Sequence, residues 1–149
     1  MIYLSKSPIK TKEIARTLIK NLKNINRKRA TVIALEGELG AGKTVFVKGL
    51  AQAFGIKSKI KSPTFTLMKK YKIAASDKQQ ATSLYHLDCY RLKDHRDLKI
   101  LGIKEILNNP ENIILIEWSD RVKKILPQNH IKIHIDHINS NTRGIAISY

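Results

Sequence analysis

Short apolar runs alternate with helical patterns along most of the chain. Residues 30–35 form a β-branched apolar run that ends at Gly37, and residues 112–117 have the same character, so both predict buried strands. From residue 11 to about 23, apolar residues recur at helical spacing, with Thr11 placed to cap the helix. The other predicted elements are strands at 65–71 and 83–88, helices at 44–54 (closed by Gly55) and 94–107, and a hairpin of 131–135 with 145–149.

A glycine-rich loop joins the strand at 30–35 to the helix at 44–54. It matches the phosphate-binding pattern GxxxxGK[ST] and reads Gly37-Glu38-Leu39-Gly40-Ala41-Gly42-Lys43-Thr44. Backbone N–H groups of such a loop, and the helix that follows, attract phosphates. Lys43 would hold the terminal phosphates, and the Thr44 hydroxyl would bind Mg²⁺. The alternative, a chance glycine turn, is negligible in this context, so the loop predicts an ATP site.

Strands interleaved with helices favour a sheet that helices cover on both faces. We therefore predict an α/β fold, a P-loop NTPase-like three-layer sandwich with a mostly parallel central sheet and a C-terminal antiparallel hairpin. A length of 149 residues suits one domain, so 1–149 are expected to form a single P-loop ATPase domain. Residues 73–82 are polar without a clear period and are expected to form a mobile loop.

Two carboxylates end predicted strands, at Asp88 and Glu117. Ligands of open α/β sheets bind at the carboxyl ends of the strands, which is where these acids would lie. One acid would hold Mg²⁺, and the other would orient the water that attacks the γ-phosphate. Alternatively, one of them caps a helix or pairs with a surface lysine. His86 and Trp118, which adjoin these acids, also fit ordinary core packing.

Ser62-Pro63-Thr64 follows the predicted helix at 44–54. Because proline restricts the backbone, the Thr64 hydroxyl would be presented on a loop that enters a strand. This position suits a switch-like segment that senses the γ-phosphate, although an ordinary turn would have the same spacing.

The formal charge of +16 would attract a polyanion, but the basic residues are spread along the chain without a block of five. Lys, Ile and Asn are all abundant, which an AT-rich genome would also impose. A single cysteine, Cys89, excludes an internal disulfide and favours a reducing compartment. No apolar run approaches the roughly 20 residues of a membrane span, and the first six residues lack the layout of a secretory signal. We expect a cytoplasmic protein without membrane association.

Four motifs together resemble the TsaE (YjeE) family. They are the glycine-rich loop 37–44, Ser-Pro-Thr-Phe-Thr-Leu at 62–67, Tyr-His-Leu-Asp-Cys-Tyr-Arg-Leu at 85–92 and Ile-Glu-Trp at 116–118. The resemblance implies a small bacterial P-loop ATPase that uses ATP and Mg²⁺. It implies a role in threonylcarbamoyladenosine modification of tRNA together with the TsaB and TsaD proteins, with tRNA contacted indirectly or weakly.

The resemblance also implies roles for single residues. Thr44 and Glu117 match the magnesium ligands, Asp88 matches the acid needed for hydrolysis, and Thr64 lies in the switch-like loop. Trp118 follows the glutamate as in the family, and Thr11 and Arg143 match positions expected near the adenosine. The chain departs from the family at Cys89, where a large apolar residue is common, and in a longer basic stretch at 24–29.

The rival interpretation is a small-molecule P-loop kinase, which would need an arginine-bearing lid. Residues 73–82 contain no arginine. A GTPase is weaker still, since neither Asn-Lys-x-Asp nor Asp-x-x-Gly occurs, and an RNA-binding module would not explain the glycine-rich loop. Arg91 is the candidate for an arginine finger within the chain, against a role in a surface ion pair or a partner contact.

Overall fold

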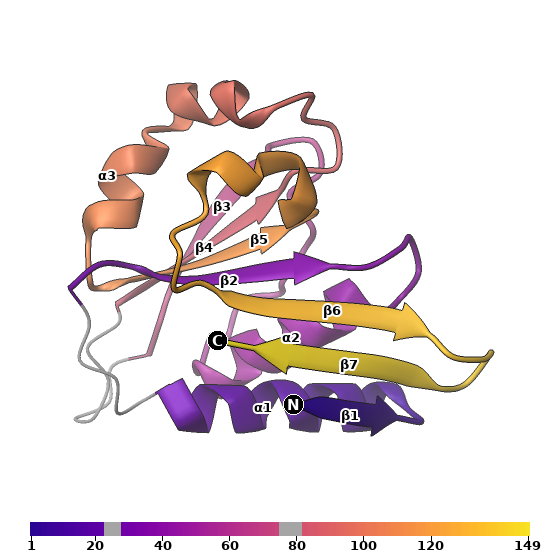
Figure 1. The fold of residues 1–149 in the computed structure, drawn as a ribbon. Coiled ribbons are helices and arrows are strands. Elements are labelled where there is room, and N and C mark those ends of the chain that lie inside the picture. Colours follow the sequence, from indigo (N-terminus) through magenta and orange to yellow (C-terminus); the bar gives the residue numbers. More distant parts are fainter. Residues whose placement is uncertain (23–27, 75–81) are drawn as a thin grey trace.

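The computed structural model describes residues 1–22, 28–74 and 82–149. Seven strands form one sheet in the order β1-β7-β6-β2-β5-β4-β3 (Figure 1). The strands are β1 (Ile2–Ser5), β2 (Thr31–Glu36), β3 (Met68–Lys72), β4 (Ser83–Asp88), β5 (Asn112–Glu117), β6 (Ile131–His137) and β7 (Arg143–Ser148). The helices are α1 (Pro8–Leu22), α2 (Lys43–Ala53) and α3 (Ile103–Asn108), with two 3₁₀ segments, η1 (His95–Leu101) and η2 (Ser119–Ile125).

The sheet is mixed, so the prediction of a mostly parallel sheet is wrong. Strands β6, β2, β5 and β4 are parallel neighbours, whereas β1–β7, β7–β6 and β3–β4 pair antiparallel. The predicted C-terminal hairpin, β6–β7, is confirmed. Together with β1, which the sequence pattern did not reveal, this hairpin forms one antiparallel end of the sheet.

Helices cover the sheet on both faces (Figure 1). On one face α1 and α2 pack over residues such as Ile33, Ile113 and Leu115. On the other face the η1, α3 and η2 segments pack over Val32, Ile114 and other strand residues that alternate with those of the first face. Every residue of β5 is buried, as expected for a strand covered on both sides. None of the described helices is long and apolar enough to cross a membrane.

Helices α1 and α2 cross closely enough to need a glycine. A Cβ at Gly49 would lie 2.7 Å from the Lys12 Cα and 2.9 Å from the Ala15 Cβ, distances that real Cβ atoms do not reach. Since α2 carries the end of the glycine-rich loop at its first turn, this contact helps to fix the loop against the body of the protein.

Helix α1 begins earlier than predicted, so Thr11 does not cap it. The Ser7 hydroxyl accepts a hydrogen bond from the Lys10 N–H at 3.1 Å, which is an N-cap arrangement, and Pro8 occupies the first helical position. The Ser-Pro pair was the signal for this start. Thr11 lies one turn inside the helix and is buried.

The strands at 30–35, 83–88 and 112–117 and the helix at 44–54 are confirmed within one or two residues. Gly55 has a φ of 67° after α2, in agreement with its predicted capping role. The predicted helix at 94–107 is interrupted at Gly102, which has a φ of 64° and separates η1 from α3. The predicted mobile loop at 73–82 and the basic stretch at 24–29 fall largely outside the described residues.

Candidate functional site

The glycine-rich loop and the two predicted acids meet at one edge of the sheet. Strands β2, β5 and β4 are adjacent and parallel, so their carboxyl ends lie side by side. Glu117 is paired in register with Leu35 on one side and with Asp88 on the other. The glycine-rich loop begins at Gly37, directly after the last residue of β2. Both acids are buried and share the sheet face that α2 covers.

The glycines of the loop are required by its backbone. Gly37, Gly40 and Gly42 have φ values of 139°, 78° and 108°, which side chains disfavour. A Cβ at Gly37 would also lie 2.4 Å from the Ile135 carbonyl oxygen of β6. At Gly42 a Cβ would meet no atom within 4 Å, so this side of the loop is open and leaves room for a phosphate.

Lys43 is folded back onto its own loop. Its Nζ donates hydrogen bonds to the carbonyl oxygens of Gly37 at 2.7 Å and Glu38 at 2.8 Å, and the residue is only 6% exposed. Burial lowers the pKa of Lys43, and the negative charges of Glu117, Asp88 and Asp120 partly offset this effect. The ammonium group therefore already lies in the field of both site acids, next to the space that a phosphate would occupy.

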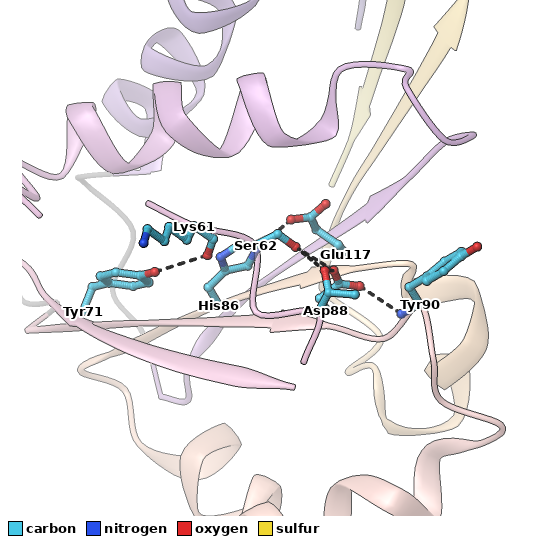
Figure 2. A network of polar contacts seen from close by, with 8 residues as sticks. Lys61, Ser62, Tyr71, His86, Asp88, Tyr90 and Glu117 are labelled. Carbon is cyan, nitrogen blue, oxygen red and sulfur yellow. Dashed lines mark hydrogen bonds and ion pairs between the residues drawn. The ribbon is translucent and has the colours of Figure 1, made fainter. Parts of the chain in front are cut away.

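Asp88 is held by the predicted switch segment (Figure 2). Its Oδ2 accepts hydrogen bonds from the hydroxyls of Ser62 at 2.7 Å and Thr64 at 2.8 Å, and its Oδ1 accepts one from the Tyr90 N–H at 3.0 Å. The structure thus brings Thr64 to Asp88, and its contact with a nucleotide stays a prediction. Ser62 was missed as a site residue, although it belongs to the same Ser-Pro-Thr motif.

Glu117 is bonded to a histidine in the protein interior. The His86 Nε2 and the Glu117 Oε1 are 2.7 Å apart, and His86 is completely buried (Figure 2). The His86 Nδ1 has no hydrogen-bond partner among the residues that the structure describes. Since only Nε2 makes a bond, the imidazole fixes one carboxylate oxygen of Glu117. His86 is therefore more than the packed strand residue that the sequence also allowed.

Trp118 packs against Lys43. The Lys43 Nζ lies 3.9 Å from the centre of the Trp118 ring, and the ring centres of Trp118 and Tyr90 are 5.0 Å apart. Trp118 and Leu67 are the non-glycine residues with positive φ in the described chain, at 57° and 65°. One follows Glu117 and the other follows the switch segment, so both strained positions flank the site.

A family model described as threonylcarbamoyl adenosine biosynthesis protein TsaE matches residues 5–145. The chain belongs to the TsaE family. The tRNA threonylcarbamoyladenosine biosynthesis protein TsaE of Haemophilus influenzae is 38% identical over 136 residues, which cover 91% of this chain and 78% of that protein. The protein of the same name from Bacillus subtilis is 35% identical over 142 residues, covering 95% and 81%. The crystal structure of Bacillus subtilis YdiB superposes with a TM-score of 0.70 at 32% identity, covering 99% and 83%.

In this TsaE-family chain a magnesium ion would depend on the nucleotide. No group of three or more His, Cys, Asp or Glu side chains suited to a metal lies within residues 1–22, 28–74 and 82–149. Mg²⁺ is usually held by one or two carboxylates together with phosphates and water, so a large protein cage is not needed. The residues present fit this mode. Glu117 has an oxygen that His86 does not bond, and Thr44 is exposed on the first turn of α2.

Thr11 and Arg143, predicted to approach the adenosine, lie at the same edge of the sheet. Ser5, at the end of β1, pairs with Arg143 at the start of β7, and the Ser5 and Thr11 hydroxyl oxygens are 2.8 Å apart. The Arg143 guanidinium donates to the carbonyl oxygens of Asn139, Ser140 and Thr142 in the turn before β7. Both side chains are therefore bonded within the protein, and their contact with a nucleotide stays a prediction.

Cys89 and Arg91 follow Asp88 in the sequence, and neither side chain forms a hydrogen bond or ion pair with its carboxylate among the described residues. The Arg91 guanidinium lies 4.4 Å from the ring centre of Phe65, an 85% exposed residue next to Thr64, so its role as an arginine finger stays a prediction. Burial raises the pKa of Cys89 to about 12, and the charge of Asp88 adds to the effect. The thiol is thus protonated at neutral pH and acts as a packed apolar group.

Replacing His86 with leucine is expected to destabilise the fold by about 1–3 kcal/mol, because Glu117 would lose its buried hydrogen-bond donor. Urea unfolding measures this change. His86→Gln is the matched control, since its amide can donate from a similar position and should recover part of the loss. Equal stability of the wild type and the leucine variant would show that the bond contributes nothing.

Trp118 is expected to report nucleotide binding in this family member. A phosphate that engages the Lys43 Nζ would draw it from its present bonds and change the charge over the indole ring. Because the chain has one tryptophan, the emission spectrum records this site alone. Titration with Mg²⁺ and ATP should shift or quench the emission. An unchanged spectrum at ATP concentrations that calorimetry shows to be saturating would contradict this placement.

Proposed function

We propose that this protein binds ATP with Mg²⁺ at the glycine-rich loop, hydrolyses it on a P-loop fold, and serves threonylcarbamoyladenosine formation on tRNA with TsaB and TsaD. The observation that carries the proposal is the convergence of Lys43, Asp88 and Glu117 at one sheet edge beside the open side of the loop. Membership of the TsaE family supports the tRNA-modification role.

Each residue has a chemical task in this proposal. The loop N–H groups and Lys43 bind the β- and γ-phosphates, and Thr44 and Glu117 hold Mg²⁺. The metal, when bound, neutralises charge that develops on the phosphates. His86 orients Glu117 through the bond between its Nε2 and the Glu117 Oε1. The Trp118 ring packs against the Lys43 ammonium group and helps to fix its position.

Asp88 would orient the attacking water, and three hydrogen bonds now fix the position of its carboxylate. Ser62 and Thr64 bond to one oxygen and the Tyr90 N–H bonds to the other. A carboxylate has about four lone-pair sites, so Oδ1 can still accept a hydrogen bond from a water. Because the segment 62–64 holds Oδ2, a partner that repositions this segment would move Asp88 relative to the phosphates, which favours a faster rate in the complex than in the isolated protein.

The test is the steady-state ATPase rate of the protein alone and with added TsaB–TsaD pair. We expect feeble turnover alone and a clear increase with the pair, although less than the roughly 10³–10⁵-fold seen when GTPases receive a missing group. The Lys43→Ala variant with the pair is the control for contaminating activity. A rate that does not respond to the pair but rises with a small-molecule acceptor would favour the kinase alternative.

A further inference from the structure

One stretch of the chain is basic throughout. Between Leu39 and residue 76 the sequence has eight lysines and no Asp or Glu. Two of the eight, Lys43 and Lys48, belong to α2, and the other six lie at 57–61 and in β3. The stretch includes the switch segment 62–64, so it leads directly to Asp88.

The segment 55–61 lies against β3, which is an edge strand of the sheet. At one end the Ala74 N–H donates to the Phe54 carbonyl oxygen at 3.3 Å. At the other end the Tyr71 hydroxyl is 3.5 Å from the Lys61 carbonyl oxygen (Figure 2). Lys69 shares the sheet face of Tyr71, since residues of a strand alternate. We call the surface formed by Lys57, Lys59, Lys61 and Lys69 the lysine face.

The charges of the lysine face are not neutralised within the described chain. Lys57, Lys59 and Lys61 are exposed, and the ion pairs among the described residues include none of the four lysines. By contrast, Lys10 pairs with Glu13 and Lys132 pairs with Glu36. Lysines on an edge strand can prevent strand-to-strand aggregation, but 57–61 are not part of a strand, so that role does not explain them.

We propose that the lysine face binds the phosphate backbone of RNA directly. The inference rests on the proposed function only in naming RNA as the polyanion available to this protein. A strand of five residues is about 16 Å long, a span over which more than one phosphate of a nucleic-acid strand can be contacted. Lysine ammonium groups are suited to such contacts, which carry little sequence information.

The composition of the face favours RNA over an acidic protein. The apolar residues of its loop segment, Ile56 and Ile60, are buried, so this part of the face exposes lysine and serine. Cores of protein interfaces are enriched in aromatic residues and depleted in lysine, which is the opposite pattern. RNA seated here would adjoin Ser62, and thus the segment that holds Asp88.

The test is binding of fluorescently labelled tRNA to the full chain, followed by anisotropy over a series of salt concentrations without ATP or partner proteins. The variant replaces Lys57, Lys59 and Lys61 with glutamine. We expect the slope of log affinity against log salt to fall in magnitude by about 2–3 and the affinity to fall roughly tenfold or more. The matched control, Lys93→Gln, Lys99→Gln and Lys104→Gln, removes three exposed charges next to and on the helical segments of the opposite face. Its slope should change by less than about 1.

Three results would overturn the proposal. Equal losses in the two triple variants would show that net charge alone draws RNA to the protein. Absence of wild-type binding at about 50 mM salt would exclude a phosphate-binding face, given the affinity that several contacts supply there. Polyglutamate that competes as well as unlabelled tRNA of equal charge would indicate an acidic protein as the occupant. Because the assay contains no ATP, its failure leaves the ATPase proposal standing, and failure of the ATPase test leaves RNA binding to be measured.

Discussion

Alanine at position 43 is expected to weaken ATP binding by about 2–3 kcal/mol or more, which is roughly 30- to 150-fold in dissociation constant. Hydrogen bonds to charged groups have this strength. The Lys43 Nζ lies beside the open side of the loop, and its N–H groups now donate to two carbonyl oxygens of the loop. Loss of the ammonium group would also leave Glu117 and Asp88 without the nearby positive charge that now acts on them. Isothermal titration calorimetry with Mg²⁺ and ATP measures the effect.

Lys48→Ala is the matched control for this variant. Lys48 lies on the same helix but is exposed, and its removal takes away the same formal charge. The ATP affinity of Lys48→Ala should stay within about threefold of the wild type, because solvent and salt screen the charge of an exposed side chain. Unchanged ATP affinity in Lys43→Ala would contradict the assignment of the loop as the phosphate site.

Asparagine at position 88 is expected to leave ATP binding largely intact while turnover falls by at least about a hundredfold. The amide is nearly the same size as the carboxylate and keeps one oxygen that can accept the Ser62 and Thr64 bonds. It lacks the negative charge that would orient and activate water. Single-turnover measurements at saturating ATP separate this loss from any change in affinity.

Asp97→Asn is the control for the Asp88 variant, because it removes the same charge from an exposed position on η1. Its turnover should equal that of the wild type. If Asp88→Asn lost ATP binding instead of turnover, Asp88 would be the main organiser of the metal. Glu117 would then be the group that positions water, and the two roles proposed here would be exchanged.

The central strands could be predicted because burial on both faces leaves a clear sequence pattern. β2 and β5 are continuous apolar runs, and the glycine-rich loop between β2 and α2 has a specific motif. β1 could not be predicted, because Ile2 and Leu4 are exposed and the strand exists only through its pairing with β7. The error about a mostly parallel sheet follows from missing β1 and from the antiparallel edge strand β3.

The site was predictable to the extent that it depends on strand ends. Asp88 and Glu117 lie side by side because their strands are parallel and in register, which the rule of strand carboxyl ends anticipates. The bond between His86 and Glu117 joins residues 31 positions apart, and no local pattern encodes it. Thr11 was misjudged as a cap because Ser7 and Pro8, just upstream, set the helix start.

The most direct test of the central claim is the threonylcarbamoyladenosine content of tRNA, measured by mass spectrometry of digested tRNA from cells depleted of this protein. We predict that the modified nucleoside is lost on depletion, returns with the wild-type protein, and does not return with Lys43→Ala expressed at the same level. Normal tRNA modification after depletion, or full recovery with Lys43→Ala, would contradict the claim that nucleotide binding at this loop serves tRNA modification.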